Sequence, residues 1–465
     1  MLPTDWEKKL VDMNVNPLRE EDIKWADYVF VSAMTVQSKS TEDVISRCNR
    51  AGVKVVAGGP LFTMAYEKTD GIDHLVLGEA EVTLPPFLKD LADGCPKPVY
   101  ECTERPALGE TPIPLWSLAN TKAYATMNIQ YSRGCPFDCE FCDITFLNGR
   151  KPRTKSREQL LKELDSLYEL GWHGSVFIVD DNFIGNKNKL KSEILPAMAE
   201  WSTKRGFPFS FYTEASINLA DDEELMQLMA NAGFNRVFVG IETPNEDSLS
   251  ECNKLQNTGR DLATSVRQIQ NHGFEVQGGF IVGFDNDPAS IFRSQINFIQ
   301  KTGIVSAMVG LLNAPKGTRL YQRLKKEDRL VTDFTGDNTD CSLNFVPKMN
   351  PEVLINGYKQ ILSAIYSPKP YYQRIRTFLK EYRPPKLRWA KAFHFYHIPA
   401  FFRIMWTLGV VDDGRTHFWR LLISTLFKRP NLLPISFNLA AFGLHFRKVA
   451  ERVVGKAMTD CSSAD

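Results

Sequence analysis

The sequence predicts an α/β protein that has two parallel sheets followed by a mainly helical region. Short apolar strands alternate with amphipathic helices over residues 1–95, and the alternation resumes over residues 126–335. A stretch rich in proline and polar residues, 96–125, reads as a linker between them. Residues 336–465 read as helices and loops with many aromatic side chains. Strands that alternate with helices are parallel, because each crossover returns the chain to the same edge of the sheet.

The bulk properties restrict the class of protein. The chain has 465 residues, of which 43% are hydrophobic and 24% charged, with a net charge of +1, so average charge does not favour a nucleic-acid binder. The charged start resembles no signal peptide. The longest apolar candidate, Leu432 to Phe446, is about 15 residues, too short to cross a bilayer. We expect a cytoplasmic protein, with peripheral membrane contact through its carboxyl-terminal region.

The first region predicts strands at 27–34 and 53–60, with a helix at 41–52 that Thr41 caps and Gly52 ends. Ligands of such parallel sheets bind at the carboxyl ends of the strands. An alternative is that the glycines there only make tight turns. The residues expected at this edge are Ser32, Thr35, Gly58, Gly59, Pro60, Gly78 and Glu79.

The second region predicts six strand–helix units, fewer than the eight of a complete barrel. Helices are expected at 156–171, capped by Ser156, and at 221–233, ended by Gly233. The expected strands are 127–134, 174–183, 209–218, 236–243, 275–284 and 306–315. Polar residues follow these strands, at the edge where barrel enzymes carry their chemistry: Cys135, Asp180, Asp181, Glu214, Glu242, Asp285 and Asn313.

The segment YSRGCPFDCEFCDI holds three cysteines, Cys135, Cys139 and Cys142, in the spacing C-x3-C-x2-C. Thiolates at this density ligate soft metals. A structural zinc usually takes four ligands, and no nearby His or Cys supplies a fourth. Iron–sulfur clusters are also normally held by four thiolates, so three would leave one iron open to another ligand. Zinc and unligated thiols stay as alternatives at this point.

This segment resembles the signature of the radical SAM enzymes, in which an aromatic residue precedes the last cysteine, here Phe141. The resemblance implies a partial (β/α)6 barrel whose three cysteines hold a 4Fe–4S cluster. The open iron then binds the amino and carboxylate groups of S-adenosylmethionine, and electron transfer cleaves this ligand to a 5′-deoxyadenosyl radical. No catalytic residue is expected beyond the cluster and the cofactors.

Further segments resemble the family's S-adenosylmethionine contacts. In IVDDNF, Asp180 and Asp181 would accept from the ligand's ammonium group. The segments TEASIN and GIET would bring Glu214, Ser216 and Glu242 to the barrel mouth. Alternatively, each acidic residue is only a helix cap or a surface charge. In GGFIVGFD, which resembles the segment that flanks adenine, Asn286 stands where the family has an acid. The other expected contacts are Phe141, Gly279, Ile281, Gly283 and, from NAPKGTRLY, Asn313.

A small parallel sheet ahead of a radical SAM barrel resembles the cobalamin-binding subclass, whose leading domain is Rossmann-like. The strand-end residues given above for 1–95 would then contact cobalamin. No D-x-H-x-x-G motif is present, so no histidine is expected to ligate the cobalt. The domain also looks truncated at its front, where residues 7–15 resemble the second strand of the family.

From Trp6 to about Arg383 the chain is most similar to cobalamin-type radical SAM methyltransferases related to the hopanoid methylases. GGPLFT, RGCPFDCEFCDI, GSVFIVDDNFIGNK and GIETP carry this likeness. The resemblance implies that methylcobalamin donates a methyl group to an unactivated carbon, with two S-adenosylmethionine molecules used per product. It also implies an electron donor such as flavodoxin or ferredoxin. Two alternatives are a radical cyclase, rearrangement or carbon–carbon coupling enzyme, and a non-catalytic carrier of cluster or cobalamin.

The carboxyl-terminal region carries a local excess of positive charge. From Pro370 to Lys456 it has 16 Lys or Arg against 4 Asp or Glu, interleaved with aromatic residues. This composition suits interfacial helices on an anionic membrane, and therefore an apolar lipid or terpenoid substrate. The alternative is a basic helical cap whose aromatic residues form core. A nucleic-acid partner is less favoured.

Overall fold

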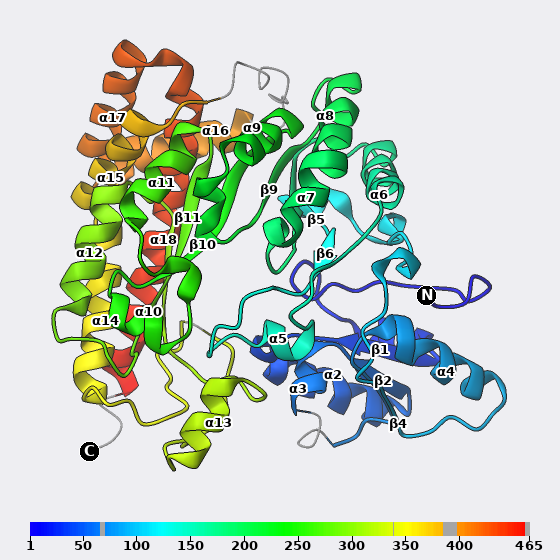
Figure 1. The fold of residues 1–465 in the computed structure, drawn as a ribbon. Helices are drawn as coiled ribbons and strands as arrows, with labels where there is room; N and C mark the ends of the chain where they lie inside the picture. Colours follow the sequence, from blue (N-terminus) through cyan, green and yellow to red (C-terminus); the bar gives the residue numbers. More distant parts are fainter. Residues whose placement is uncertain (66–69, 338, 385–397, 461–465) are drawn as a thin grey trace. The chain divides into compact units, whose positions relative to one another are not determined.

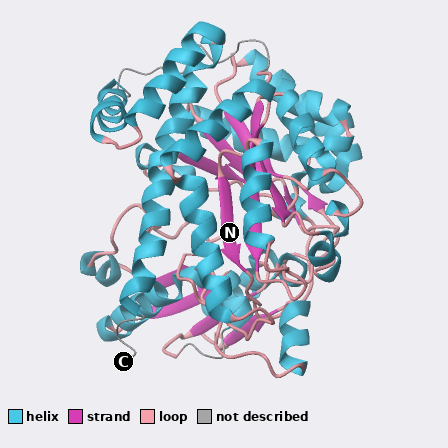
Figure 2. Ribbon diagram, turned by 90° about the vertical axis from the view of Figure 1, so that its left-hand side faces the viewer, coloured by secondary structure: helices cyan, strands magenta, loops and turns pink. Residues whose placement is uncertain are grey.

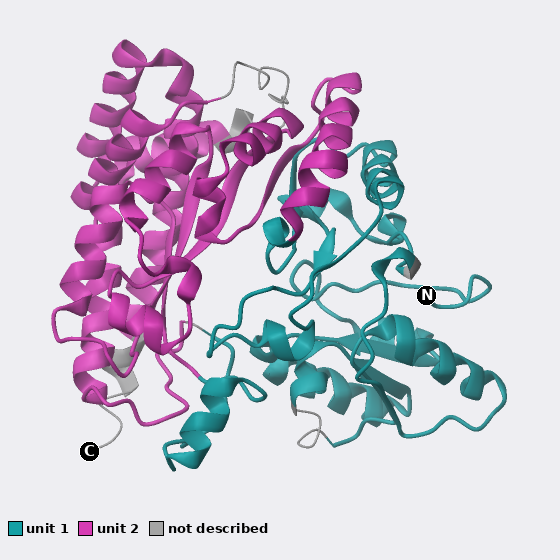
Figure 3. Ribbon diagram, in the orientation of Figure 1, with its two compact units in different colours: residues 1–185, 314–337 teal, residues 186–313, 338–465 magenta. Residues whose placement is uncertain are grey.

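The structure is a computed structural model of the chain, and it describes residues 1–65, 70–337, 339–384 and 398–460 (Figure 1). The chain divides into two compact units (Figure 3). Unit 1 comprises residues 1–185 and 314–337, and unit 2 comprises residues 186–313 and 338–465. The boundaries predicted at 95, 125 and 335 separate the domains expected from the sequence, which are not the same divisions as these two compact units. Those domain boundaries stay predictions.

Unit 1 begins with a parallel sheet in the order β1-β2-β3-β4. Its central strand β2, Lys54–Gly58, is buried on both faces: Val55 and Ala57 belong to one apolar cluster, and Val56 belongs to another. Such a strand needs apolar residues at successive positions, which is why KVVAG shows no alternation. The elements of unit 1 are α1 (Glu20–Trp25), β1 (Tyr28–Ser32), α2 (Ser38–Ala51), β2 (Lys54–Gly58), α3 (Pro60–Ala65), β3 (His74–Leu77), α4 (Ala80–Ala92), β4 (Val99–Glu101), β5 (Thr126–Ile129), β6 (Ser132–Arg133), α5 (Ile144–Leu147), β7 (Arg153–Thr154), α6 (Arg157–Glu169), β8 (Ser175–Ile178) and α13 (Arg319–Lys326).

Three details of this region differ from the sequence-based expectation. Residues 7–15 form no strand, and β4 lies inside the expected linker, where it pairs in parallel with β3. A three-residue edge strand has no periodicity to detect, so only its pairing partner reveals it. Helix α2 begins at Ser38, three residues before the predicted cap Thr41, which is buried within the helix. Its predicted end is confirmed, since Gly52 follows it with φ +71°.

The six strands predicted for the second region are all present and parallel to their partners. In unit 1, β5 pairs with β8. In unit 2, β9, β10, β11 and β12 pair in sequence. Ser156 caps α6 by accepting from the Gln159 N–H at 3.1 Å, and Gly233 ends α9 with φ +107°. These local signals predict helix ends well because each acts within one turn.

Helices make up most of unit 2. Figure 2 shows the helices and strands of the chain in different colours. The carboxyl-terminal helices pack on one another and on α12, and α14 also lies against β12. Among the described residues, no helix is long and apolar enough to cross a membrane. The elements of unit 2 are α7 (Lys187–Lys189), α8 (Leu195–Lys204), β9 (Ser210–Glu214), α9 (Glu223–Ala232), β10 (Phe234–Glu242), α10 (Glu246–Glu251), α11 (Leu262–Asn271), β11 (Glu275–Val282), α12 (Ile291–Thr302), β12 (Ala307–Leu311), α14 (Pro351–Tyr366), α15 (Pro368–Glu381), α16 (Ile398–Trp406), α17 (Arg415–Lys428) and α18 (Leu433–Asp460).

Part of the basic carboxyl-terminal region is core. Arg374 on α15 is fully buried and donates to the carbonyl oxygens of Ile365 at 2.8 Å and Val305 at 3.0 Å. Its guanidinium also lies over the rings of Tyr366 and Tyr371, at 5.6 and 5.1 Å from their centroids. Around Arg374 the aromatic side chains of this region therefore form core. Residues 385–397, which carry two of the histidines and three of the cations of the tail, lie outside the described residues.

Candidate functional site

The three cysteines lie on one loop that a short hairpin closes at its base. Strands β6 and β7 pair antiparallel, with Arg133 opposite Arg153, and the loop between them holds Cys135, Cys139 and Cys142. Within the loop, the Cys135 N–H donates to the Gly149 carbonyl and the Cys142 N–H to the Cys139 carbonyl, both at 3.2 Å. Cys139 is buried, and the other two thiols are partly exposed.

The donor set of this loop suits an iron–sulfur cluster. Among the described residues, no three His, Cys, Asp or Glu side chains converge closely enough to hold one metal ion. A cubane cluster places each thiolate on a different iron, so the three sulfurs need not meet at a single point. Three soft thiolates on a short loop are the donors that a 4Fe–4S cluster requires.

Gly134 gives the loop a backbone conformation that no other residue takes without strain. Its φ is +94°, and a Cβ atom there would lie 2.9 Å from the carbonyl oxygens of both Gly149 and Lys151. These contacts are to backbone, which cannot move aside as a flexible side chain does. The glycine therefore lets the two arms of the loop approach each other directly before Cys135.

Two carboxylates after β8 support the start of this loop. Asp180, 1% exposed, accepts from the Tyr131 N–H at 2.8 Å and the Ser132 hydroxyl at 2.7 Å. Asp181 accepts from the Gly134 N–H at 2.7 Å and from the Asn148 amide at 2.9 Å. Burial raises the pKa of Asp180 to about 7, and it also raises the pKa of Asp181, although hydrogen bonds oppose both shifts.

These contacts differ from the role that the sequence predicted for the two acids. Both oxygens of Asp180 accept from the chain that leads into the cysteine loop, so its carboxylate positions the loop. Its expected contact with the S-adenosylmethionine ammonium stays a prediction, as does that of Asp181. The following residue, Asn182, was missed: its amide nitrogen lies 3.9 Å from the Cys135 sulfur. Hydrogen bonds to thiolate sulfur are one way in which proteins adjust a cluster's reduction potential.

Helix α13 clamps the cysteine loop from a distant part of the sequence. The Leu320 N–H donates to the Glu140 carbonyl at 2.9 Å, and Arg323 binds the Glu140 carboxylate through two nitrogens, at 2.7 and 3.1 Å. Arg319 donates to the Asp138 carbonyl at 2.5 Å. Asp138 and Glu140 flank Cys139, so this helix fixes the middle of the loop. Nothing in the local sequence signals this contact.

An ion-pair network joins the hairpin base to the start of α4. Arg133 lies 2.8 Å from Glu79 and 2.8 Å from Glu81, and Arg153 lies 2.6 Å from Glu79. The four side chains are between 5% and 17% exposed. Glu79, which the sequence placed at the cobalamin edge, thus connects the amino-terminal sheet to the loop. All of these residues belong to unit 1.

The residues predicted for the cobalamin edge lie at or just after the carboxyl ends of β1, β2 and β3, and their contacts with the cofactor stay predictions. Ser32 and Gly58 are partners across β1 and β2. A Cβ on Gly59 would lie 2.6 Å from the Ser32 hydroxyl, and one on Gly78 would lie 2.8 Å from a backbone carbonyl. Thr35 and Pro60 begin the helical turns that follow β1 and β2. An edge of bare backbone and small hydroxyls fits a large planar ligand that must approach closely.

Unit 2 carries the remaining residues that the sequence predicted. Glu242 ends β10 with φ +63° and pairs with Lys254 at 2.6 Å, so its charge has a partner within the protein. Ser216 donates to the Asn218 side chain at 2.6 Å. Asn313 accepts from the Asn344 N–H at 3.1 Å and so holds the segment after residue 338. Glu214 ends β9.

The glycines in and just after strand β11 allow close packing and a left-handed backbone conformation. A Cβ on Gly279 would lie 2.9 Å from the Phe238 ring, and Gly283 has φ +110°. Ile281 lies between them and is partly exposed. Asp287, one residue after Asn286, accepts from the N–H groups of Gly283 and Phe284 at 2.8 and 3.1 Å and so holds the turn after β11.

Family models match three parts of the chain. Residues 3–88 match a B12 binding domain, residues 129–297 match the radical SAM superfamily, and residues 318–458 match a domain of unknown function, DUF4070. The first two matches agree with the predicted order of the domains. The third begins at the helix that clamps the cysteine loop.

Similar proteins cover nearly the whole chain. An uncharacterized methyltransferase of Synechocystis sp. is 40% identical over 99% of this chain and 87% of its own length. The hopanoid C-2 methylase of Rhodopseudomonas palustris is 33% identical over 92% of this chain and 82% of its own length.

Among solved structures, the radical S-adenosylmethionine methyltransferase TsrM from Kitasatospora setae, with cobalamin and a [4Fe–4S] cluster bound, shares the fold. It gives a TM-score of 0.62 at 14% identity, over 95% of this chain and 91% of that one. The cobalamin-dependent radical enzyme OxsB gives 0.60 at 16% identity, over 97% and 75%.

Proposed function

Because the chain belongs to the cobalamin-dependent radical SAM methyltransferases, we propose that it methylates an unactivated carbon of an apolar, lipid-like substrate at a membrane surface. When bound, the cluster with S-adenosylmethionine supplies the radical and cobalamin supplies the methyl group. An electron donor such as a flavodoxin or ferredoxin supplies the electron. The substrate class, the membrane contact and the donor are parts of the proposal.

The chain's own residues would hold and orient these groups. Cys135, Cys139 and Cys142 would bind the cluster, with Asp180 and Asp181 fixing the start of their loop. The residues proposed to contact S-adenosylmethionine are Glu214, Ser216, Glu242, Gly279, Ile281, Gly283 and Asn313, and those proposed to contact cobalamin are Ser32, Thr35, Gly58, Gly59, Pro60 and Gly78. Phe141, Asp180 and Asp181 are also proposed to contact S-adenosylmethionine, and Glu79 to contact cobalamin.

The observation that carries the substrate class is a stripe of exposed apolar side chains in unit 2, here called the apolar stripe. On α17, Trp419, Ile423 and Phe427 recur at every fourth position and are 41%, 52% and 82% exposed. The opposite face of the same helix buries Phe418, Leu421 and Thr425, so the stripe is not the core face. Further exposed apolar residues lie on α16, just after it and on α17: Phe402, Trp406, Val410, Val411 and Leu426.

Cations lie among these apolar residues. Arg415, Arg420 and Lys428 are exposed on α17, and Arg403 is exposed on α16. Large apolar side chains next to Lys and Arg are typical of helices that lie in the interface of an anionic bilayer. A surface of this kind would let the enzyme collect a substrate dissolved in the membrane.

The methyl transfer is tested with protein that is purified without oxygen and reconstituted with iron, sulfide and cobalamin. It is incubated with S-adenosylmethionine that carries a labelled methyl group, and with a lipid extract that contains polycyclic terpenoids. We expect a lipid whose mass rises by one labelled methyl. Formation of 5′-deoxyadenosine together with a product that gains no methyl would favour cyclisation, rearrangement or carbon–carbon coupling instead. Absence of 5′-deoxyadenosine under every condition would favour the non-catalytic carrier.

The membrane contact is tested by flotation with phosphatidylglycerol vesicles. We expect the parent protein to float with the vesicles and the Trp419→Glu/Phe427→Glu variant to stay in solution. Val331→Glu is the control, because Val331 is an exposed apolar residue (57%) that lies in unit 1. Equal flotation of all three proteins, or of none, would contradict the contact.

A further inference from the structure

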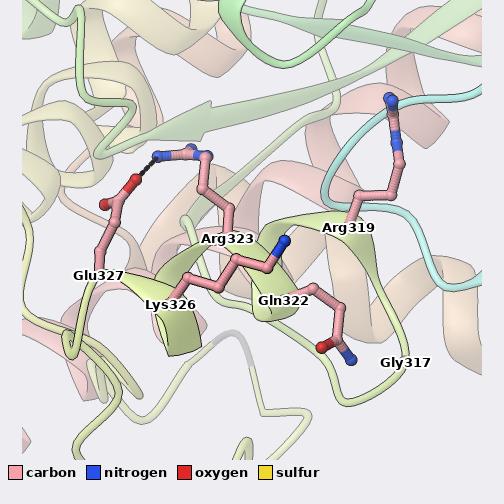
Figure 4. A pocket seen from close by; sticks show the side chains of 6 residues that line it. All are labelled: Gly317, Arg319, Gln322, Arg323, Lys326 and Glu327. Atoms are coloured by element: carbon pink, nitrogen blue, oxygen red, sulfur yellow. Dashed lines mark hydrogen bonds and ion pairs between the residues drawn. The ribbon is translucent and has the colours of Figure 1, made fainter.

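Helix α13 exposes a hollow on the same element that grips the cysteine loop. The hollow has a volume of about 450 Å³ (Figure 4). Its lining residues come from α13 and the turns on either side of it, all within unit 1: Gly317, Arg319, Gln322, Arg323, Lys326 and Glu327. A ligand seated here would therefore contact the helix whose other bonds reach Asp138 and Glu140, on either side of Cys139.

The hollow is positively charged. Three cations line it, whereas its one carboxylate, Glu327, already lies 3.4 Å from Arg323 and 2.7 Å from Arg329. Further positive charge lies beside it: Lys325 is exposed on the same helix, and Arg150, 62% exposed, reaches Asp138 at 3.7 Å. Arg319 also reaches this carboxylate, at 3.5 Å, so Asp138 is shared by two arginines, and Glu140 is bound by Arg323 at 2.7 Å.

Helix stability by itself does not account for this arrangement. Lys325 and Lys326 stand in the last turn of α13, where cations are favourable beside the helix dipole. Arg319 is the first residue of the helix, where a positive charge is unfavourable, yet its side chain is 53% exposed. Arg319 holds Asp138 of the cysteine loop, and its exposed guanidinium can at the same time face a partner with negative charge.

We propose that the hollow on α13 is the docking site of a small acidic protein that delivers single electrons, of the flavodoxin or ferredoxin class. This rests on the proposed function, because opening the carbon–sulfur bond of S-adenosylmethionine consumes one electron. The donor is oxidised by one electron, the bond breaks, and methionine leaves. The 5′-deoxyadenosyl radical then takes a hydrogen atom and becomes 5′-deoxyadenosine. Docking beside the cysteine loop places the donor where this electron must enter, and complementary charge steers the encounter.

The test compares one protein donor with a small chemical reductant. The reconstituted enzyme is given either an acidic flavodoxin in its hydroquinone form or dithionite, and 5′-deoxyadenosine is measured. Affinity for the flavodoxin is measured separately by titration calorimetry at low and high salt. The variants are Lys326→Glu and Gln322→Glu, which reverse or add charge inside the hollow and touch no bond to the cysteine loop. Lys89→Glu is the control, because it makes the same charge change as Lys326→Glu at an exposed lysine on α4, in the same unit.

We expect both hollow variants to weaken flavodoxin binding by about tenfold at low salt and less at high salt, since salt screens the lost attraction. The flavodoxin-driven rate should fall with the affinity, while the dithionite-driven rate stays at the parental value. The control should match the parent in every measurement.

Unchanged affinity in the hollow variants, or an equal fall under both reductants, would overturn the docking site. A parent enzyme that makes no 5′-deoxyadenosine even with dithionite would instead overturn the proposed function. In that case the calorimetric comparison of variant with control still decides the docking site, because it needs no turnover.

Discussion

Replacing Arg133 by methionine tests whether the ion-pair network holds the amino-terminal sheet and the cysteine loop together. The guanidinium is bonded to Glu81 through two nitrogens, at 2.8 and 3.0 Å, and to Glu79 at 2.8 Å. Methionine has similar length and no charge. The variant therefore keeps much of the packing and removes the partner of a carboxylate that is only 5% exposed.

The expected loss follows from this burial. Removing one partner of a buried ion pair costs about 3–5 kcal/mol, because the other charge stays buried and uncompensated. We take the lower end, about 3 kcal/mol, since Arg133 is 17% exposed and Glu79 keeps Arg153. For a unit of about 200 residues, each kcal/mol moves the melting temperature by about 2–4 °C. The melting temperature should therefore fall by roughly 6–12 °C at neutral pH.

The loss should depend on pH in one direction. Burial alone would raise the pKa of Glu81, but the hydrogen bonds and charge of Arg133 outweigh it, so the net pKa is lowered. A lowered folded-state pKa contributes stability above the unfolded-state pKa and loses it as the pH falls through the folded-state value. Without Arg133 the burial is opposed only by hydrogen bonds from Thr111 and the backbone, so the pKa of Glu81 rises. The gap between parent and variant should therefore be wide at about pH 8 and narrow towards about pH 5.

The assay is thermal unfolding followed by circular dichroism, at both pH values, on protein handled without oxygen. Arg157→Met is the control, because Arg157 is 51% exposed and pairs with an exposed glutamate. Exposed pairs contribute at most about 1 kcal/mol, so this variant should melt close to the parent. A drop of less than about 2 °C for Arg133→Met at pH 8, or a wider gap at pH 5, would refute the network's role.

Three further predictions concern the cysteine loop. Cys139→Ala should abolish cleavage of S-adenosylmethionine, because it removes a cluster ligand; 5′-deoxyadenosine formed at the parental rate would refute the cluster assignment. Gly134→Ala should lower iron content and thermal stability together, because its Cβ would strike two backbone carbonyls, and parental iron binding would contradict this. Asp180→Asn should gain stability relative to the parent as the pH rises from about 4 to 7. In that range the acid ionises readily in the unfolded parent, whereas burial raises its folded-state pKa to about 7, so the parent loses stability. Melting temperatures of both proteins at each pH measure this difference. A constant difference across that range would mean that Asp180 ionises normally.

The sequence was sufficient for features that act over short distances. Three cysteines within eight residues identified the cluster loop, and Ser156 and Gly233 marked helix ends, since each signal works within one turn. Six apolar runs separated by amphipathic helices gave the strands β5 and β8 to β12. These features can be predicted because the spacing of residues along the chain itself determines whether a loop, a helix end or a strand forms.

Elements without a periodic pattern were misjudged. Strand β4 is three residues long and lies in a proline-rich segment, so only its pairing with β3 identifies it. Residues 7–15 are apolar enough for a strand but find no partner in the sheet. In the tail, composition alone does not separate Arg374, buried against two tyrosines, from the exposed cations of α17.

Amino-acid order alone therefore determined which cofactors this protein is built to use, because their ligands are local motifs. Only the tertiary structure decided what the neighbouring charges do. Glu79 and Asp180, which motif reasoning assigned to cofactors, are bonded to the hairpin that carries the cysteines. Glu140 is held by Arg323, 183 residues away in the chain. A buried carboxylate takes whichever donor folding brings within about 3 Å, and no local pattern encodes that choice.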